Sequence, residues 1–292
     1  MVQAAAVRDG LTKLGAEVDV VPMRTQGDRL AEKRLAELGG KGLFVKDLED
    51  ALLRGDIDLA VHSLKDLPAA IPAGLVVAAY PEREDPRDVL VTRARARLED
   101  LRAGAVVGTS SPRRRAIALS VRQDLVIDPI RGNVDTRLRK FADGHLDAII
   151  LASAGLRRLG LTPPHVEPLS LDVFVPAVGQ GILGIEARSD DRRTLQLLEG
   201  LDDGTTRACA LAERAYLRRL GASCVTPMAA HATVDGRRLI LVGIVLSDDG
   251  RQVLRDTAEG DPGAAEDLGR RLGEALLERG AARITALKPE GR

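Results

Sequence analysis

The stretch "AVVGTSSPRRRAIALSVR" runs from Ala105 to Arg122 and joins a short apolar strand to a capped helix. Ala105–Val107 has the character of a buried strand, Ser111 is a favoured N-cap residue, and Pro112 suits the first helical position. The helix then begins with three arginines. Backbone N–H groups, hydroxyls and guanidinium groups therefore meet at a helix N-terminus, which is an arrangement that binds anions.

The same order of strand, polar loop and helix recurs on both sides of this stretch. Strands are expected at Val18–Pro22, Ile57–Val61, Ala105–Val107, Leu125–Ile130 and Ala148–Ala152, and helices at Leu43–Arg54, Arg113–Arg122 and Val134–Ala142. Strands that alternate with helices in this way predict parallel α/β sheets.

Two proline-rich connectors divide the chain into domains. The first is "PEREDPRD" (Pro81–Asp88) and the second ends near Gly181, so the chain is expected to leave one lobe and return to it. We predict α/β lobe 1 from residues 1–81 with 182–200 and α/β lobe 2 from residues 87–176. Residues 202–292 are predicted to form a small α+β domain, with a long helix over Thr205–Leu220, two strands around Asp235–Gly236 and a helix over Ala264–Arg279.

The composition excludes several classes of protein. Lys+Arg and Asp+Glu both number 43 and aromatic residues make up 2%, which argues against a nucleic-acid binder. The sequence lacks the run of about 18 apolar residues that a membrane span needs. Two cysteines make no disulfide framework and no signal peptide is recognised, so a cytoplasmic protein is expected. Four histidines without a Cys-x-x-Cys pair predict structural or solvated roles and no metal site.

Polar loops follow four of the predicted strands, at the ends where α/β sheets bind ligands. "VHSLKDLP" offers Lys65 beside Asp66, and the other loops repeat the cationic helix start; they are "GTSSPRRR", "IRGNVDTR" and "ASAGLRRLG". Each loop by itself is also explained as a capped helix with solvated charges. Together they indicate a cleft for several carboxylates or phosphates. Asp66 is expected to be ionised there, either as the acceptor for a cationic intermediate or as a partner in a structural ion pair.

Two further short segments bear on the site. "GGKGLF" (residues 39–44) lacks the G-x-x-x-x-G-K-[ST] spacing of a phosphate loop, so a nucleotide site is rejected and a flexible turn that exposes Lys41 is expected. Cys224 lies in the loop "GASCVTP", without a periodic apolar pattern around it. Cys209 lies inside such a pattern and is expected to be a core residue.

The motifs "GGKGLF", "AVHSLKDLP", "EREDPRD", "GTSSPRR", "RGNVDTRL", "AGLRRLG", "PAVGQG" and "GASCVTP" follow one another in the order found in the porphobilinogen deaminase family, which the sequence resembles over nearly its whole length. The resemblance implies a transferase of tetrapyrrole synthesis that condenses four porphobilinogen molecules and releases ammonia. It also implies two lobes similar to the halves of periplasmic binding proteins, and a C-terminal domain that presents Cys224 to the cleft between them.

The resemblance assigns roles to particular residues. It implies that a dipyrromethane cofactor is attached through a thioether to Cys224, for which a soft thiol nucleophile is well suited. Asp66 matches the catalytic aspartate, which stabilises the positive charge that develops as ammonia leaves. The implied cofactor-binding residues are Cys224, Lys65, Thr109, Ser110, Ser111, Arg113, Arg114, Arg131, Asn133 and Arg137, and the implied substrate-binding residues are Arg158, Phe44, Lys41 and Gln3. The implied partners are porphobilinogen and the growing polypyrrole chain, bound to a monomer.

The sequence departs from the family pattern in two places. Family members begin with a strand and a segment like "R-x-S-x-L-A-x-x-Q", of which only Gln3 has a match here, so we expect that the first strand of lobe 1 is missing and that Met1 is a misassigned start. Glu37 stands where many relatives have a lysine. The main alternative is a two-lobed anion receptor without catalysis, which explains the arginines but gives Cys224 no task.

Overall fold

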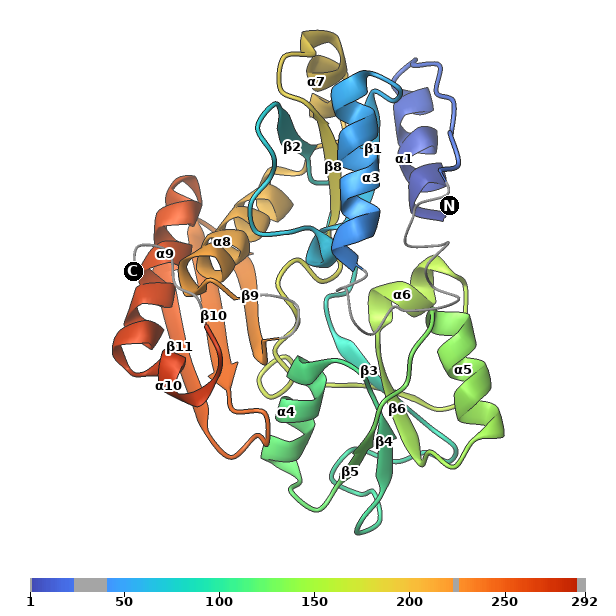
Figure 1. Ribbon diagram of the computed structural model, residues 1–292, viewed down its shortest axis with the longest axis vertical. Coiled ribbons are helices and arrows are strands. Elements are labelled where there is room, and N and C mark those ends of the chain that lie inside the picture. Colours follow the sequence, from blue (N-terminus) through green and yellow to red (C-terminus); the bar gives the residue numbers. More distant parts are fainter. Residues whose placement is uncertain (1, 24–40, 223–225, 288–292) are drawn as a thin grey trace. The chain divides into compact units, whose positions relative to one another are not determined.

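The computed structural model describes residues 2–23, 41–222 and 226–287, and the chain divides into two compact units. Unit 1 comprises Met1–Arg83 and Ile182–Arg207, and unit 2 comprises Glu84–Gly181 and Ala208–Arg292. Helices and strands alternate in both units, and an antiparallel sheet with flanking helices closes the chain (Figure 1). The predicted fold class, α/β with a small C-terminal α+β part, is confirmed.

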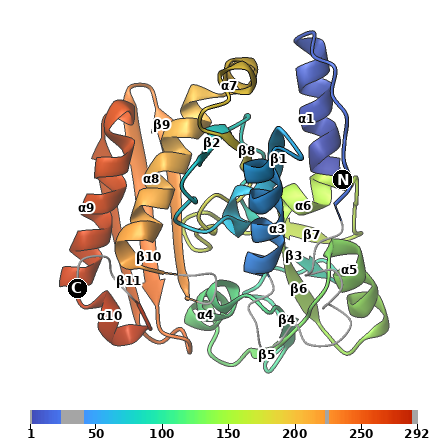
Figure 2. The same ribbon diagram turned by 45° about the horizontal axis from the view of Figure 1, so that its top comes forward.

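Unit 1 is built on a three-stranded sheet with helices on both faces. The sheet has the order β1-β8-β2, from Leu59–Ser63, Leu183–Arg188 and Leu75–Ala79, and both pairings are antiparallel. Its helices are α1 (Val2–Lys13), α3 (Lys41–Arg54) and α7 (Arg192–Glu199). Residues of α1 and α7 share one buried cluster with β8, while Leu52 of α3 packs on β1 and β2 from the other side. Figures 1 and 2 show α3 (blue) lying along β1.

Unit 2 contains a five-stranded sheet with the order β5-β4-β6-β3-β7. The strands are β3 (Asp88–Thr92), β4 (Val106–Gly108), β5 (Val126–Asp128), β6 (Ala148–Ala152) and β7 (Val166–Pro168). β4 runs parallel to β5 and β6, whereas β3 runs antiparallel to β6 and β7. The helices are α4 (Pro112–Val121), α5 (Val134–Asp143) and α6 (Ser153–Arg158). Because β5, β4 and β6 are parallel, the loops that follow them lie at one edge of the sheet.

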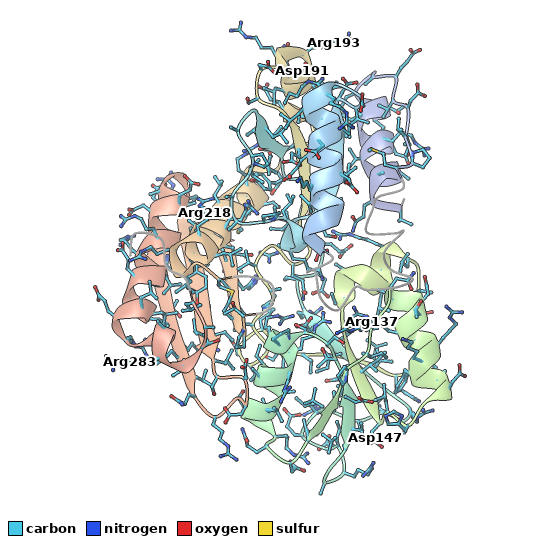
Figure 3. All side chains as sticks on the ribbon, viewed as in Figure 1. Arg137, Asp147, Asp191, Arg193, Arg218 and Arg283 are labelled. Carbon is cyan, nitrogen blue, oxygen red and sulfur yellow. The ribbon has the colours of Figure 1, made fainter. Side chains whose placement is uncertain are left out.

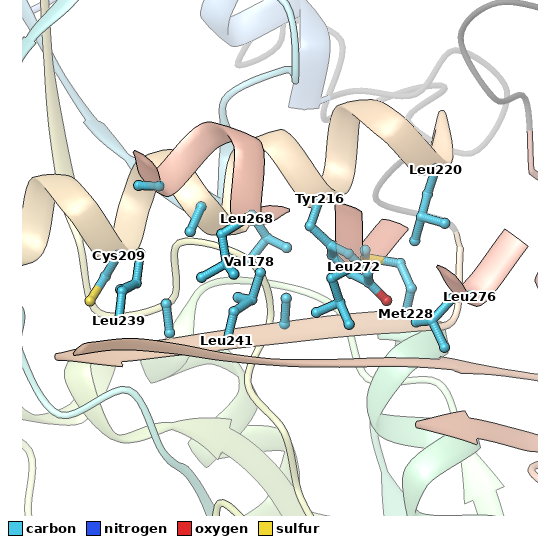
Figure 4. Packing of buried hydrophobic residues seen from close by; sticks show 14 of the residues in the cluster. Val178, Cys209, Tyr216, Leu220, Met228, Leu239, Leu241, Leu268, Leu272 and Leu276 are labelled. Atoms are coloured by element: carbon cyan, nitrogen blue, oxygen red, sulfur yellow. The ribbon is translucent and has the colours of Figure 1, made fainter. Parts of the chain in front are cut away.

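A second sheet of unit 2 has the antiparallel order β11-β10-β9, from Val253–Gly260, Arg238–Leu246 and Met228–Asp235. Helices α8 (Gly204–Leu220) and α9 (Ala265–Glu278) cover it, and a short helix α10 (Ala281–Ile284) follows. Tyr216, Leu268 and Leu272 form the centre of this core (Figure 4). The two helices cross closely at Gly269, which has no side chain. A β-carbon at this position would overlap the carbonyl oxygen of Ala212.

The structure corrects several expectations about secondary structure. Residues 18–22 form no strand in the described part of the chain, although Val18 packs against the buried core of unit 1. Residues 41–44 are the first turn of α3, so the expected turn at Lys41 is wrong there. The prediction of parallel sheets holds only for β5-β4-β6. Strands β2, β3, β7 and β8 were not predicted, and every antiparallel pairing of the first two sheets includes β2, β3 or β8. The residue pattern of a strand carries no sign of its direction.

Candidate active site

The loop after β4 is fixed by hydrogen bonds to the neighbouring strand. The Thr109 backbone N–H donates to the carbonyl oxygen of Asp128 (2.9 Å), and the Ser110 hydroxyl donates to that of Ile130 (3.0 Å). Ser111 caps α4 as predicted, since its Oγ accepts from the backbone N–H of Arg114 (3.4 Å), and Pro112 is the first helical residue. Thr109 is buried while Ser110 is exposed. The loop is therefore held rigidly, with hydroxyls at the edge of the sheet.

Arg113 and Arg114 point into unit 2 and are only 5% and 6% exposed. Both contact the fully buried carboxylate of Asp88, with 2.7 Å from Arg113 Nη1 to Asp88 Oδ2 and 2.7 Å from Arg114 Nη2 to Asp88 Oδ1. Burial by itself raises the pKa of Asp88, but the charges of the two arginines outweigh burial and hold that pKa well below its usual range. Burial lowers the pKa of Arg113. Two cations thus share one anion in a buried cluster.

Sequence reasoning missed Asp88. It predicted a cationic helix start but treated "PEREDPRD" as a connector, although the last residue of that segment begins β3. The alternation of charges in the segment hides the one carboxylate that becomes buried. Its neighbour Asp85, whose side chain is only 10% exposed, lies in a second cluster, where it accepts hydrogen bonds from Arg87 and from the Ser153 hydroxyl.

The loop after β5 carries the other predicted anion-binding residues. Asn133 caps α5, with its Oδ1 accepting from the Thr136 backbone N–H (2.9 Å). Arg137 Nε donates to the carbonyl oxygen of Gly132 (2.7 Å), which holds its side chain against the loop (Figure 3). Arg131 is exposed. The structure thus brings Arg131 to the same edge of the sheet as Ser110.

Arg158 follows β6 at the same edge. Its Nη2 donates to the carbonyl oxygen of Gly181 (2.8 Å), and burial lowers its pKa. Arg157 beside it is exposed and pairs with Glu84 (3.1 Å). Of these two side chains, Arg158 is partly buried and Arg157 is exposed.

Unit 1 holds the predicted catalytic residue. Lys65 and Asp66 lie in a 3₁₀ turn (Leu64–Asp66) directly after β1, and both are half-buried. The Leu64 backbone N–H donates to the carbonyl oxygen of Ile182 (3.0 Å), which ties the turn to the segment directly before β8. Gln3 Nε2 donates to Ser63 Oγ (2.8 Å) just before the turn. The structure therefore brings Gln3 and Asp66 to the same end of β1.

Just before this turn in the sequence, β1 contributes to a buried pair of polar side chains that sequence reasoning missed. His62 Nε2 lies 3.0 Å from Glu186 Oε2, and both side chains are buried between β1 and β8. Burial and the neighbouring Glu186 raise the pKa of Glu49, which α3 places over the same face. An isolated histidine in an apolar strand gave no signal that two glutamates face it.

The remaining predictions fall partly outside the described residues. Cys224 and Glu37 lie outside them, and for Lys41 and Phe44 only the helical backbone is described. Cys209 is buried in the core of α8 and the C-terminal sheet (Figure 4), so its predicted core position is confirmed. Among the described residues, no three His, Cys, Asp or Glu side chains gather to hold a metal ion. Nor does any helix in these ranges have the length and apolar character to cross a membrane.

Two α/β units that carry guanidinium, hydroxyl and carboxylate groups at their strand ends define a protein suited to ligands with several carboxylates or phosphates. Comparison with known proteins identifies which enzyme family this is. Residues 1–196 match the family described as "Porphobilinogen deaminase, dipyromethane cofactor binding domain", and residues 207–278 match "Porphobilinogen deaminase, C-terminal domain".

Relatives match along nearly the whole chain. The porphobilinogen deaminase of Syntrophotalea carbinolica is 49% identical over 97% of this chain and 91% of its own length. That of Thiobacillus denitrificans is 47% identical over 99% of this chain and 95% of its own length. Among solved structures, the periplasmic VFT2 domain of Bordetella pertussis BvgS aligns with 68% of this chain and 76% of that one, at 11% identity and a TM-score of 0.40. The chain belongs to the porphobilinogen deaminase family.

Proposed function

We propose that this chain binds the carboxylates of its cofactor and substrates with the arginines of unit 2 and performs the chemistry with Asp66 of unit 1. The reaction itself follows from the family: the chain is a transferase of tetrapyrrole biosynthesis that condenses four porphobilinogen molecules into hydroxymethylbilane and releases ammonia. It works with a dipyrromethane cofactor.

The observation that carries the proposal is the buried cluster of Arg113, Arg114 and Asp88. Two guanidinium groups against one carboxylate leave an excess of one positive charge in a site shielded from water. A buried charge without a counter-ion is costly, so such a site favours a further anion. Guanidinium groups suit carboxylates because they form paired hydrogen bonds with them. The donor set therefore fits a ligand that carries several carboxylates, as the cofactor does.

Around this cluster we assign residues by their place at the sheet edge. Ser110 and Arg131 are exposed there and are proposed to contact carboxylates directly, together with Thr109, Ser111, Asn133, Arg137 and Arg158. Asn133 also caps α5, so part of its role is to hold the loop. Lys65, Gln3, Lys41 and Phe44 are proposed to contribute from unit 1.

Asp66 is proposed to accept hydrogen bonds from the pyrrole N–H groups and to stabilise the positive charge that develops when ammonia leaves. A carboxylate fixed near a developing cation lowers the barrier most when its position is set before the reaction. The 3₁₀ turn supports this proposal, because the Leu64 backbone N–H donates to the carbonyl oxygen of Ile182, directly before β8. When bound, the dipyrromethane supplies the pyrrole end to which the substrate units are added.

The attachment point is proposed to be Cys224, in the segment between α8 and β9. Cys209 serves as the matched control, because it is the other cysteine of the chain and is a buried core residue. Cys224→Ser is expected to lack the mass of a two-pyrrole adduct and to have almost no turnover, since a serine hydroxyl is a far poorer nucleophile. Cys209→Ser is expected to keep the adduct. Loss of the adduct from Cys209→Ser instead would overturn the assignment, and intact mass measurement decides between the two.

We further propose that the chain acts as a monomer in the cytoplasm, with porphobilinogen and the growing polypyrrole as its partners. Light scattering that gives a mass near 31.2 kDa supports the monomer, and a dimer mass contradicts it. Cell fractionation tests the compartment.

A further inference from the structure

The carboxylate of Asp88 is held from three sides. Its Oδ1 accepts from Arg114 Nε (3.1 Å) and Nη2 (2.7 Å) and also from Gln180 Nε2 (2.9 Å), while its Oδ2 lies 2.7 Å from Arg113 Nη1. The same Gln180 nitrogen donates to the carbonyl oxygen of Pro86 (2.8 Å). Asp88 and Gln180 are both 0% exposed. Gln180 therefore joins the carboxylate to the backbone in front of β3.

Each arginine is also fixed by a backbone carbonyl. Arg113 Nη1 donates to Val175 (2.8 Å), and Arg114 Nη1 donates to Ile150 (3.0 Å). A planar guanidinium that makes two such contacts in different directions has one orientation available to it. Since polar groups in a buried network depend on one another, a change at Asp88 or Gln180 is felt at both arginines.

The turn that carries Gln180 is tied to helix α8. The backbone N–H of Gly179 donates to Glu213 Oε2 (2.6 Å), and the other oxygen of Glu213 accepts from the Ala232 backbone N–H (2.8 Å). Glu213 lies on α8 and is 0% exposed. Gly179 has a φ of 71°, a left-handed conformation that favours glycine, so the turn requires a glycine at this position. Hydrogen bonds thus connect α8, which leads toward Cys224, with the arginine pair.

We propose that Asp88 and Gln180 are positioning residues, which hold Arg113 and Arg114 in the orientation that binds the carboxylates of the cofactor. The proposal rests on the function proposed above, in which these arginines bind carboxylates. Asp88 compensates one of the two positive charges, so the pair stays buried, and it leaves the other charge for the ligand. Gln180 adds a neutral donor that fixes the carboxylate without cancelling the remaining charge.

A double-mutant cycle with the cofactor tests this. Gln180→Met keeps the length of the side chain and removes its N–H donors, so it is gentler than a change at buried Asp88. It is made both in the natural chain and in Cys224→Ser, which is expected to carry no adduct, and melting temperature and adduct mass are measured for all four proteins. A bound group that contacts only the folded state stabilises it, so the natural chain should melt higher than Cys224→Ser.

If Gln180 positions the arginines, this increment in melting temperature falls to about half or less in Gln180→Met, because coupled groups are not additive. The fraction of chains with the adduct falls as well. If its role is only structural, Gln180→Met lowers the melting temperature equally in both backgrounds, and the proposal is overturned. Gln123→Met is the matched control: Gln123, like Gln180, donates its Nε2 to two oxygen atoms, here the carbonyl oxygens of Leu119 (2.8 Å) and Asp249 (3.1 Å) at the surface.

Arg113→Lys in the same cycle separates this proposal from the one it rests on. If Arg113→Lys reduces the increment and Gln180→Met does not, the arginine binds the cofactor but Gln180 does not position it. If neither variant changes the increment, the carboxylate role of Arg113 is wrong and the positioning role falls with it. An adduct that persists in Cys224→Ser contradicts the proposed attachment instead.

Discussion

Asp85→Asn removes one charge from the cluster at the start of unit 2 and keeps the shape of the side chain. In the native chain, Arg87 donates to both carboxylate oxygens (2.9 and 2.8 Å) and the Ser153 hydroxyl donates to one of them (3.1 Å). The hydrogen bond from the Arg87 side chain is the main cause that lowers the pKa of Asp85 from 3.8 to about 2. Asp85 is therefore more acidic in the folded chain than in the unfolded one.

The size of the effect follows from this difference. One pKa unit corresponds to about 1.4 kcal/mol, and the Arg87 side chain is 40% exposed, so solvent weakens the pair. With that screening, the ionised carboxylate stabilises the fold by about 1–2 kcal/mol at neutral pH. Because the folded-state pKa is the lower one, this stability is fully present above the unfolded-state pKa of about 4 and is lost as pH falls toward 2.

The assay is urea unfolding of both proteins at pH 7, 5, 4 and 3, followed by far-UV circular dichroism because the chain has no tryptophan. The difference in unfolding free energy should be constant between about pH 7 and 5 and should shrink by about half near pH 3. Asp143→Asn, at the exposed end of α5, controls for the loss of a surface carboxylate and should change little. A difference that stays undiminished at pH 3 refutes the reasoning, because it would then come from packing and not from the charge of Asp85.

Three further predictions concern one packing contact and two site residues. Gly269→Ala should lower the melting temperature by about 5 °C or more, since the overlap with the α8 carbonyl outweighs the gain of about 1 kcal/mol in helix propensity. Gly204→Ala, where a β-carbon meets open space, should not lower it, and equal losses in the two variants would contradict the packing argument. Asp66→Asn should keep the adduct mass and lower kcat by about 100-fold or more, and a kcat within about threefold of the native value removes Asp66 from catalysis. Arg131→Leu should lower the fraction of chains with the adduct, whereas Arg139→Leu on the exposed face of α5 should not; the masses of the purified proteins decide this.

The local elements of the fold could be predicted where the sequence has strong local signals. The cap at Ser111, the proline after it and the apolar run before it fixed one strand–loop–helix unit, and the structure reproduces all three. The strand β6 and the helices α5 and α8 were found by the same means, within one residue at each end. Caps and turns act over three or four residues, so a single sequence contains their whole cause.

The direction and the partners of the strands were decided by the tertiary structure. β3 is an apolar run like those of parallel strands, and β8 mixes apolar with charged residues, but both pair antiparallel with strands far away in the chain. Hydrophobic periodicity reports which face of a strand is buried and does not report which neighbour it meets. For the same reason, Val18 looked like part of a strand although no described strand pairs with it.

The sequence by itself determined that this chain carries several arginines at helix starts and two cysteines in different surroundings, because residue type and local spacing are written in it. Only the tertiary structure decided what Arg113 and Arg114 face. Their partner Asp88 lies more than twenty residues earlier in the sequence, in a charged segment. Gln180 comes later in the sequence than every strand of the five-stranded sheet. Whether a charge is solvated or buried against a counter-ion depends on contacts between distant segments, and burial then sets both its pKa and its value as a ligand site.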